Sequence, residues 1–429
     1  MTIEVRPPVS PSESLEYLRV LPYVNGFPQE EPEPSAWYAG TAAWPPQVPP
    51  TAADLDRYAE ELQADWFRPQ AAFVDGKIAG GSAIVSVQVT VPGGRQLALG
   101  GVTSTAVLPT YRRRGLLRKI MSAMLADCRE RGEFLAGLSA SEGTIYGRYG
   151  FSPATFQHRW EVRRTDVAFR SEFSDSGALE LVDGVVAGEV WPVLHEQARA
   201  QRVGEISPLP GKWDGLSAGA LPADGSGPAH HLVHRDAAGA VDGAAIFRLP
   251  WSPDPAQAGV LQVEAFEALT SDAYRALWGL LLDFDLTKRV VAARRPVDEP
   301  LRWMLTNPRA LKLTRTRDNL WLRILDVQGA LEARTYAATD SLVLDVSDDL
   351  FGSGRWRLDA APAGAACTAT NQTADLSLGI AELGSLYLGG VRASELSHAG
   401  RIDEHTPGAI SRLDAVLRTE RAPHNAVGF

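Results

Sequence analysis

A strand-to-helix junction at residues 107–128 constrains the fold of this chain more than any other segment. Apolar side chains recur every three or four residues from Leu116 to Cys128, with charged side chains between them. This spacing predicts one amphipathic helix that buries a single face. Gly132 follows the helix, and residues 134–138 then form a short apolar run that is typical of a buried strand. The apolar face of the helix therefore requires a sheet to pack against.

The residues before this helix predict that sheet. Asp75-Gly76 lies between two apolar runs, where Asp-Gly predicts a tight hairpin turn. Pro92-Gly93-Gly94 marks a second turn, so we expect residues 82–91 and 96–107 to be antiparallel neighbours. The first part of the chain should thus hold a meander of roughly three strands followed by the helix.

Length and an internal repeat predict a chain of several domains. Its 429 residues are about three times the usual size of one domain. Residues 231–243 repeat the strand, turn and strand pattern of the first region, and a strand and a helix are predicted after them at 259–265 and 273–284. A third α+β region is predicted from about Asn319. We predict a mixed α/β chain of the α+β class, with domains at residues 1–160, 161–308 and 309–429.

The composition disfavours several classes of partner. The chain has 42 Lys and Arg against 52 Asp and Glu, a net charge of -10, which argues against nucleic-acid and anionic-membrane partners. Cys128 and Cys367 are its two cysteines, too few for a disulfide framework or a cysteine zinc site. We therefore expect a reducing, cytoplasmic compartment. No secretory signal and no run of about 18 apolar residues is found, so neither export nor membrane insertion is expected.

The loop of the strand-to-helix junction carries the clearest chemical signal. Arg112, Arg113, Arg114 and Gly115 stand between the end of the strand and the start of the helix. The first turn of a helix presents unpaired N–H groups and the positive end of the helix dipole, and glycine permits close approach of an anion. A phosphate-binding loop is predicted, although an isolated Arg-rich turn can also be a solvated surface feature.

This junction resembles the acetyl-CoA site of the GNAT superfamily of N-acetyltransferases. Arg112, Gly115 and Leu117 fall on its Arg/Gln-x-x-Gly-x-Gly/Ala pattern, and Leu at the last place is similar to one subfamily, the enhanced intracellular survival acetyltransferases. Residues 140–151 (ASEGTIYGRYGF) resemble a second signature of that subfamily. Residues 387–390 and 398–402 resemble its sterol-carrier-like C-terminal domain.

The resemblance covers essentially the whole chain and implies a fold and a reaction. It implies an N-terminal catalytic GNAT domain, a central GNAT-like domain without a cofactor loop and a sterol-carrier-like third domain. It also implies acetyl-CoA as co-substrate and an amine that attacks the thioester directly in a ternary complex, without a covalent acyl-enzyme. The residues expected to contact the cofactor are Thr105, Ala106, Val107, Arg112, Arg113, Arg114, Gly115, Leu116, Leu117, Ser141 and Glu142.

The resemblance further implies the residues that move protons. Tyr146 is the expected general acid for the departing thiolate, and the α-carboxylate of Phe429 is the expected acceptor of the amine proton. Trp37 and Ser139 are expected to line the acceptor pocket. Three structural alternatives stay open: Tyr146 packed at a sheet edge, Ser141 as a helix N-cap, and a free tail around Phe429.

The acceptor and the assembly are less defined. Glu30, Glu31 and Glu33, in a stretch with eight prolines between Pro22 and Pro50, favour a cationic acceptor such as a polyamine, an aminoglycoside or a lysine-like amine. The resemblance also implies a homo-oligomer, for which a hexamer is one candidate.

The central copy of the repeat should bind no acetyl-CoA. It has Thr270-Ser271-Asp272 where the first copy has arginines, and Asp272 would repel a pyrophosphate.

Three other interpretations are weighed. His230, His231 and His234 look like metal ligands, but strand residues four apart lie about 13 Å from each other, so no metal is expected. Residues 137–141 approach a serine-hydrolase elbow without its last glycine. A coenzyme A or lipid carrier is the alternative function. The apolar helix residues that it would use are simpler to explain as core: Leu383, Leu386, Ile410, Leu413 and Leu417.

Overall fold

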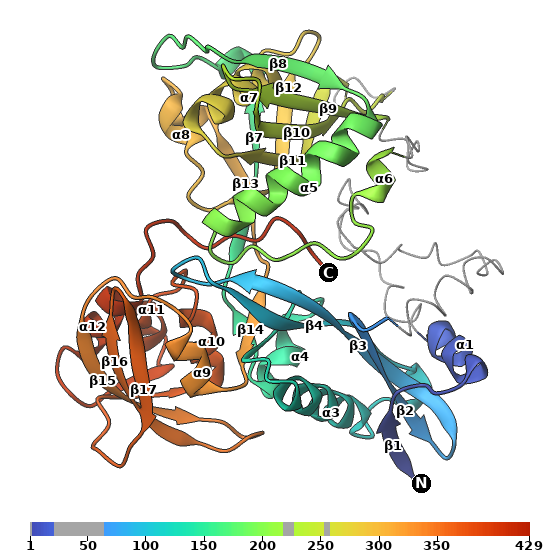
Figure 1. The fold of residues 1–429 in the computed structure, drawn as a ribbon, viewed down its shortest axis with the longest axis vertical. Coiled ribbons are helices and arrows are strands. Elements are labelled where there is room, and N and C mark those ends of the chain that lie inside the picture. The colour runs from blue at the N-terminus through green and yellow to red at the C-terminus, as the bar shows by residue number, and fades with distance from the viewer. Residues whose placement is uncertain (1, 21–63, 218–226, 253–257) are drawn as a thin grey trace. The chain divides into compact units, whose positions relative to one another are not determined.

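The computed structural model describes residues 2–20, 64–217, 227–252 and 258–429 (Figure 1). Trp37 and the three glutamates of the proline-rich stretch lie outside the described residues. So do residues 52–63, for which the sequence predicts a helix. The chain divides into two compact units. The first comprises Met1–Thr155, Asp318–Pro423 and Val427–Phe429, and the second comprises Phe156–Arg317 and His424–Ala426. The three-domain boundaries stay a prediction.

The first unit contains a sheet of seven strands within the described part of the chain. In spatial order they are β1 (Ile3–Arg6), β2 (Phe67–Val74), β3 (Lys77–Thr90), β4 (Gln96–Val107), β5 (Leu135–Leu138), β14 (Trp321–Ile324) and β6 (Ser152–Pro153). The predicted meander is confirmed, since β2, β3 and β4 pair antiparallel and Asp75 and Gly76 adopt positive φ angles of 46° and 81°.

The predicted amphipathic helix is confirmed as α3 (Leu116–Glu130). Its apolar face is buried against this sheet: Leu116, Ile120, Met121, Met124, Leu125 and Cys128. Two shorter helices belong to the same part of the chain, α1 (Pro11–Val20) and α4 (Gly143–Tyr146).

Strand β14 corrects one expectation from the sequence. The third region is predicted to begin at about Asn319, but β14, which follows that residue, inserts between β5 and β6 of the first sheet and pairs antiparallel with both. Its Arg323 is fully buried and donates two hydrogen bonds to Asp348, at 2.9 and 2.7 Å. A buried arginine needs such a partner, so this ion pair ties the first sheet to the C-terminal region of the same unit.

The C-terminal part of the first unit has its own five-stranded sheet in the described residues. Its order is β17 (Gly364–Ala369), β16 (Gly354–Ala361), β15 (Asp340–Ser347), β18 (Leu376–Gly379) and β19 (Ile402–Glu404). The helices are α9 (Val327–Glu332), α10 (Ile380–Leu386), α11 (Ala393–His398) and α12 (Ala409–Leu417).

The interior of this part is packed by helix residues, as predicted. Leu383, Leu386, Leu413 and Leu417 are all buried, whereas Ile410 is half-buried. The buried guanidinium of Arg334 donates to the carbonyl of Tyr387, the residue just after α10. It also donates, at 3.0 Å, to the carbonyl of Leu417, the last residue of α12. Cations stabilise helix C-termini, so Arg334 holds both helix ends.

The second unit is built around another seven-stranded sheet of the described residues. Its order is β13 (Lys312–Asp318), β7 (Phe156–Arg163), β12 (Arg289–Pro296), β11 (Val260–Ala268), β10 (Val241–Arg248), β9 (Ala229–Arg235) and β8 (Ala178–Val182). The helices are α5 (Gly184–Gln201), α6 (Asp214–Ser217), α7 (Ser271–Leu282) and α8 (Leu301–Met304). The predicted repeat of hairpin, strand and helix is confirmed as β9, β10, β11 and α7. In the described ranges, no helix combines the length and the apolar character that a membrane span requires.

Candidate active site

A β-bulge in β4 shapes the centre of the candidate site. Gly81 faces Ala106 across β3 and β4, whereas Ala83 faces Thr103, so Ser104 and Thr105 both stand opposite Ser82. Ser104 takes a positive φ of 51°, which is unusual for a residue other than glycine. Bulges bend a strand and redirect its side chains, and they are frequent beside active sites.

Beyond the bulge, β4 runs without β5 beside it. The parallel pairing of β4 with β5 covers Leu99 to Gly101, while β4 continues to Val107. The N–H of Leu108 donates to Ala79 on the β3 side at 2.9 Å. Because successive N–H groups of a strand point to opposite edges, the N–H of Val107 points to the edge that β5 has left. This opening exposes backbone donors and acceptors that a substrate can pair with.

The arginine loop joins this strand end to α3. Arg112 donates to the carbonyl of Val107 at 3.3 Å, and Arg114 donates to that of Thr110 at 3.1 Å. Arg113 adopts a positive φ of 62°, and its guanidinium has no hydrogen-bond partner among the described residues. All three arginines are exposed. Two of them therefore brace the loop through its carbonyls, and Arg113 is available to a ligand.

The first turn of α3 keeps its N–H groups open. Gly115 is the N-cap with a φ of 77°, and no side chain caps the helix. No acidic residue occupies the first turn. Leu116, which follows Gly115, is buried in the core and anchors the turn, while Leu117 is half-buried. The loop thus has the open backbone donors that an anion at a helix N-terminus uses.

An open hollow of about 590 Å³ adjoins this helix end. Its lining residues come from β1 and the first turns of α3: Ile3, Val5, Gly115, Arg118, Lys119 and Ser122. Sequence reasoning assigned Arg118 and Lys119 to the solvated face of the helix and missed this hollow. Their spacing of three and four residues from Gly115 places them on one face above the loop, which was the available signal.

Tyr146 lies at the end of the short helix α4 with its ring in the core. The residue is 8% exposed. Burial raises the pKa of Tyr146 above its ordinary value, although the neighbouring Ser141 and Thr105 side chains act in the opposite direction. The hydroxyl therefore holds its proton at neutral pH, as a general acid must.

The surroundings of Tyr146 decide one open alternative. Ser141 is not an N-cap, because Glu142 occupies the cap position of α4 and makes no side-chain cap. Ser139 is exposed and directly follows β5. Ala106 is a buried residue of β4.

The C-terminal residue reaches the opening between β4 and β5. The ring of Phe429 lies 2.9 Å from the point where a Cβ on Gly101 would stand, and Gly101 is the last β4 residue paired with β5. Val427 is 2% exposed. The alternative of a free tail is therefore wrong, and the structure brings the C-terminal residue to the strand that carries Thr105 and Val107.

The preceding tail residues are also held, within the second unit. The N–H of His424 donates to the carbonyl of Val203 at 2.9 Å, and the N–H of Ala426 donates to the carboxylate of Glu205 at 2.8 Å. His424 and Asn425 are buried.

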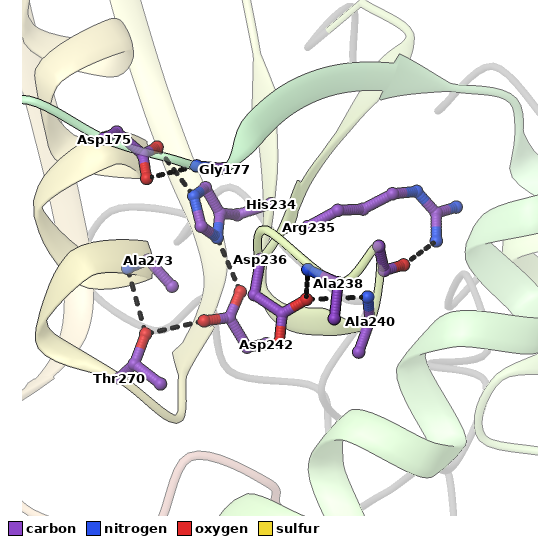
Figure 2. A network of polar contacts seen from close by, with 11 residues as sticks. Asp175, Gly177, His234, Arg235, Asp236, Ala238, Ala240, Asp242, Thr270 and Ala273 are labelled. Atoms are coloured by element: carbon purple, nitrogen blue, oxygen red, sulfur yellow. Dashed lines mark hydrogen bonds and ion pairs between the residues drawn. The ribbon is translucent and has the colours of Figure 1, made fainter.

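In the central copy of the repeat, the N-terminus of α7 corresponds to the N-terminus of α3. A polar network occupies this helix end instead of open N–H groups (Figure 2). His234 lies 2.5 Å from Asp242 through Nδ1 and 2.8 Å from Asp175 through Nε2. Thr270 caps α7 by accepting the N–H of Ala273 at 3.1 Å, and its hydroxyl donates to Asp242 at 2.6 Å. This helix end is thus occupied by a capping side chain and a carboxylate, which disfavours an anionic ligand.

The histidines that resembled metal ligands have separate partners. The ring of His230 stacks on Phe247 with centroids 5.1 Å apart, while His234 bonds to two carboxylates. Burial lowers the pKa of His231. Within the described ranges, no group of three or more His, Cys, Asp or Glu side chains is arranged to hold a metal ion.

Comparisons with known proteins match three segments of the chain to domain families. Residues 36–154 and 210–324 each match an acetyltransferase (GNAT) domain, and residues 327–426 match a sterol carrier protein domain. The predicted fold class, a mixed α/β chain with tandem GNAT domains and a C-terminal sterol-carrier-like domain, is confirmed.

Relatives match most or all of the length of the chain. An uncharacterized N-acetyltransferase of Streptomyces griseus is 37% identical over 99% of both chains. N-acetyltransferase Eis of Mycobacterium tuberculosis is 34% identical, over 82% of this chain and 86% of its own length. The crystal structure of Eis1 from Mycobacterium abscessus superposes with a TM-score of 0.82 and 30% identity over the full length of both chains.

Proposed function

Since this chain belongs to the Eis-type GNAT N-acetyltransferases, we propose that it transfers the acetyl group of acetyl-CoA to a primary amine of a cationic acceptor. The amine attacks the thioester directly in a ternary complex. The observation that carries this proposal is that three features lie along or beside β4: an open strand edge at Val107, the buried Tyr146, whose pKa the Thr105 side chain influences, and the ring of Phe429 at Gly101.

The residues present fit acetyl-CoA as co-substrate. The uncapped first turn of α3 and the free guanidinium of Arg113 suit the pyrophosphate, and the open edge of β4 at Thr105 and Val107 suits the amide groups of the pantetheine arm. Arg118 and Lys119 beside the hollow add positive charge for a further phosphate. Ser141 and Glu142 belong to the same end of the site in this proposal.

Each chemical demand of the reaction has a candidate group. The tetrahedral intermediate carries negative charge on the former carbonyl oxygen, and the N–H of Val107 is the proposed donor. The departing thiolate needs a proton, and the buried Tyr146 hydroxyl is the proposed acid. The attacking amine must lose a proton, and the α-carboxylate of Phe429 is the proposed acceptor.

The acceptor class, assembly and location extend this proposal. The net charge of -10 favours cationic amines, with Trp37 and Ser139 as proposed pocket residues. A homo-oligomer and a cytoplasmic location stay predictions, the latter from two cysteines that are both free thiols. Nucleic acid is not a proposed partner.

The alternative of a coenzyme A or lipid carrier is not favoured. Four of the five apolar helix residues that a carrier would use to bind a lipid are buried. Packing of the sterol-carrier-like part is therefore enough to explain these residues.

An acceptor screen tests the proposal. Purified full-length chain with an unmodified C-terminus is mixed with acetyl-CoA and a panel of polyamines, aminoglycosides and lysine peptides, and released coenzyme A is measured. We expect release with at least one cationic amine, an acetylated product by mass, and intersecting initial-rate lines, as direct transfer requires. Coenzyme A or lipid binding without release from any amine would support the carrier instead.

A further inference from the structure

Helix α10, in the part of the chain that matches a sterol carrier protein domain, lies directly against β14 and β6 at one end of the first sheet. Ser385 is buried and donates to the carbonyl of Pro153 at 2.7 Å, and its Oγ also lies 2.7 Å from Oγ of Ser152. A Cβ on Gly384 would stand 2.6 Å from the carbonyl oxygen of Leu322, so glycine permits this close approach. Backbone contact and one buried hydroxyl therefore fix α10 to both strands.

The buried guanidinium of Arg323 on β14 makes a second connection to the sterol-carrier-like part. Its Nη2 donates to the carboxylate of Asp348 at 2.9 and 2.7 Å, whereas Nε and Nη1 have no hydrogen-bond partner among the residues that the structure describes. Nη1 lies 2.5 Å, and Cγ2 of Ile380 lies 2.8 Å, from the point where a Cβ on Gly150 would stand. Asp348 thus holds a guanidinium that packs on the backbone of Gly150.

Phe351 adds an aromatic contact at the same place. Its ring packs against the core cluster that includes Tyr146. The guanidinium carbons of Arg323 and Arg129 lie 5.3 and 4.4 Å from the centroid of this ring, and such cation–π contacts strengthen where water is excluded. Asp348 and Phe351, three residues apart in the sequence, therefore both contact Arg323.

These contacts fall on the turn that carries Tyr146. The N–H of Phe151 donates to the carbonyl of Tyr146 at 3.4 Å, and the N–H of Gly150 donates to that of Gly147 at 3.1 Å, so residues 146–151 form a hydrogen-bonded turn. The guanidinium holds this turn at Gly150, and α10 holds the chain just after Phe151. The backbone of the turn would pass a shift of either contact on to Tyr146.

We propose that Ser385 and Arg323 are positioning residues for Tyr146, and that, with Asp348, they form a clamp by which the sterol-carrier-like part holds the segment that carries Tyr146. This inference rests on the proposed transferase function, in which Tyr146 is the acid. None of the three clamp residues contacts a substrate in that proposal, so the clamp acts through the position of the tyrosine alone. It gives the C-terminal part of the chain a role in catalysis that needs no ligand.

Two conservative substitutions loosen the clamp without removing an apolar side chain from the core. Ser385→Ala deletes one buried hydroxyl. Asp348→Asn keeps the shape of the side chain but removes the negative charge that the buried Arg323 requires. Ser411→Ala on α12 and Asp349→Asn are the matched controls, because both of these residues are exposed.

Amide hydrogen exchange of the protein without ligands, measured by mass spectrometry, tests the clamp without turnover. We expect residues 143–153 to exchange faster in Ser385→Ala and Asp348→Asn than in wild type, while both controls and the central strand β3 keep wild-type rates. Wild-type exchange of residues 143–153 in the clamp variants would overturn the inference, and either variant suffices if the other fails to fold. An equal acceleration in β3 would show a general loss of stability and would overturn it as well.

Steady-state kinetics connect the clamp to catalysis. In both clamp variants kcat should fall about tenfold, because a displacement near 1 Å can cost a factor of about 10². The KM for acetyl-CoA should not change, because the arginine loop before α3 makes none of these contacts. A rise in KM with an unchanged kcat would contradict the positioning role. A wild-type protein without any turnover would overturn the transferase proposal, and the exchange measurement would still decide whether the clamp holds the Tyr146 segment.

Discussion

The ring of Phe429 occupies the space that a side chain at residue 101 would need. Phe429 Cε2 lies 2.9 Å and Val85 Cγ2 lies 2.7 Å from the position of a Cβ built on Gly101. Carbon atoms in contact normally stand about 3.5 to 4.0 Å apart, so only glycine admits the ring here. The Phe429 ring thus packs against the backbone of Gly101, at the point where β4 and β5 part.

Gly101→Ala should therefore displace the C-terminal residue. We expect kcat to fall about 10- to 100-fold, because displacements near 1 Å cost a comparable factor, while the KM for acetyl-CoA stays near wild type. Gly279→Ala on α7 is the control, since open space surrounds that position. Steady-state kinetics of both variants make the measurement. Full activity of Gly101→Ala would show that the position of the ring does not matter for turnover.

Removal of Gly428 and Phe429 should separate catalysis from cofactor binding. We expect turnover to fall by about 10²- to 10⁴-fold, the usual contribution of a general base, with unchanged acetyl-CoA affinity by calorimetry. Phe429→Leu keeps the carboxylate and should lose less activity than the deletion. A C-terminal tag that leaves activity intact would rule out the carboxylate as proton acceptor.

Tyr146→Phe should remove the acid without disturbing the core. The substitution keeps the buried ring, so the melting temperature should change little. Turnover should fall about 10²- to 10⁴-fold. Since burial raises the pKa of Tyr146, wild-type activity should persist to alkaline pH before a basic limb appears. Normal acetylation rates in Tyr146→Phe would mean that another group protonates the thiolate.

The cofactor loop should respond to loss of charge and to a side chain at Gly115. Arg112→Ala and Arg113→Ala should each raise the KM for acetyl-CoA, about tenfold for one lost charged contact. Gly115→Val should weaken binding more, because a β-branched residue resists the φ of 77° and a Cβ would intrude on the anion site. Arg131→Ala, at the opposite end of α3, is the control. Calorimetry that detects no change in the three loop variants would exclude this site.

The His234 network should make stability depend on pH. Burial lowers the pKa of His234, but its hydrogen bonds with Asp242 and Asp175 outweigh this and raise the pKa above its ordinary value. The folded state therefore gains stability from protonated His234 below about pH 6.5, and loses it as pH rises through the folded-state pKa. Asp175, whose pKa is lowered, acts in the other direction and loses its contribution only in acid.

His234→Gln tests this pH dependence. Its melting temperature should lie about 3–8 °C below wild type near pH 6, and the difference should shrink in alkaline solution. A difference that is constant across this range would show that His234 stabilises the unit by packing alone.

Local patterns in the sequence determined the elements that hold the site, because hairpin turns and helix periodicity depend on neighbouring residues. Asp75-Gly76 and the apolar face of α3 were predictable in this way, as was the arginine loop. The resemblance to acetyltransferases drew attention to Tyr146 and Phe429. None of this located a bulge at Ser104, since bulges arise from pairing between strands.

The tertiary structure alone decided which distant segments meet. Strand β14 joins the first sheet from more than 150 residues away, and nothing local to residues 321–324 distinguishes that sheet from the one that follows. The contact of Phe429 with Gly101 and the hydrogen bond of Ser82 with Thr105 also join residues that are distant in the sequence. Side chains of ordinary type acquire a chemical role there only because the folded backbone brings them together.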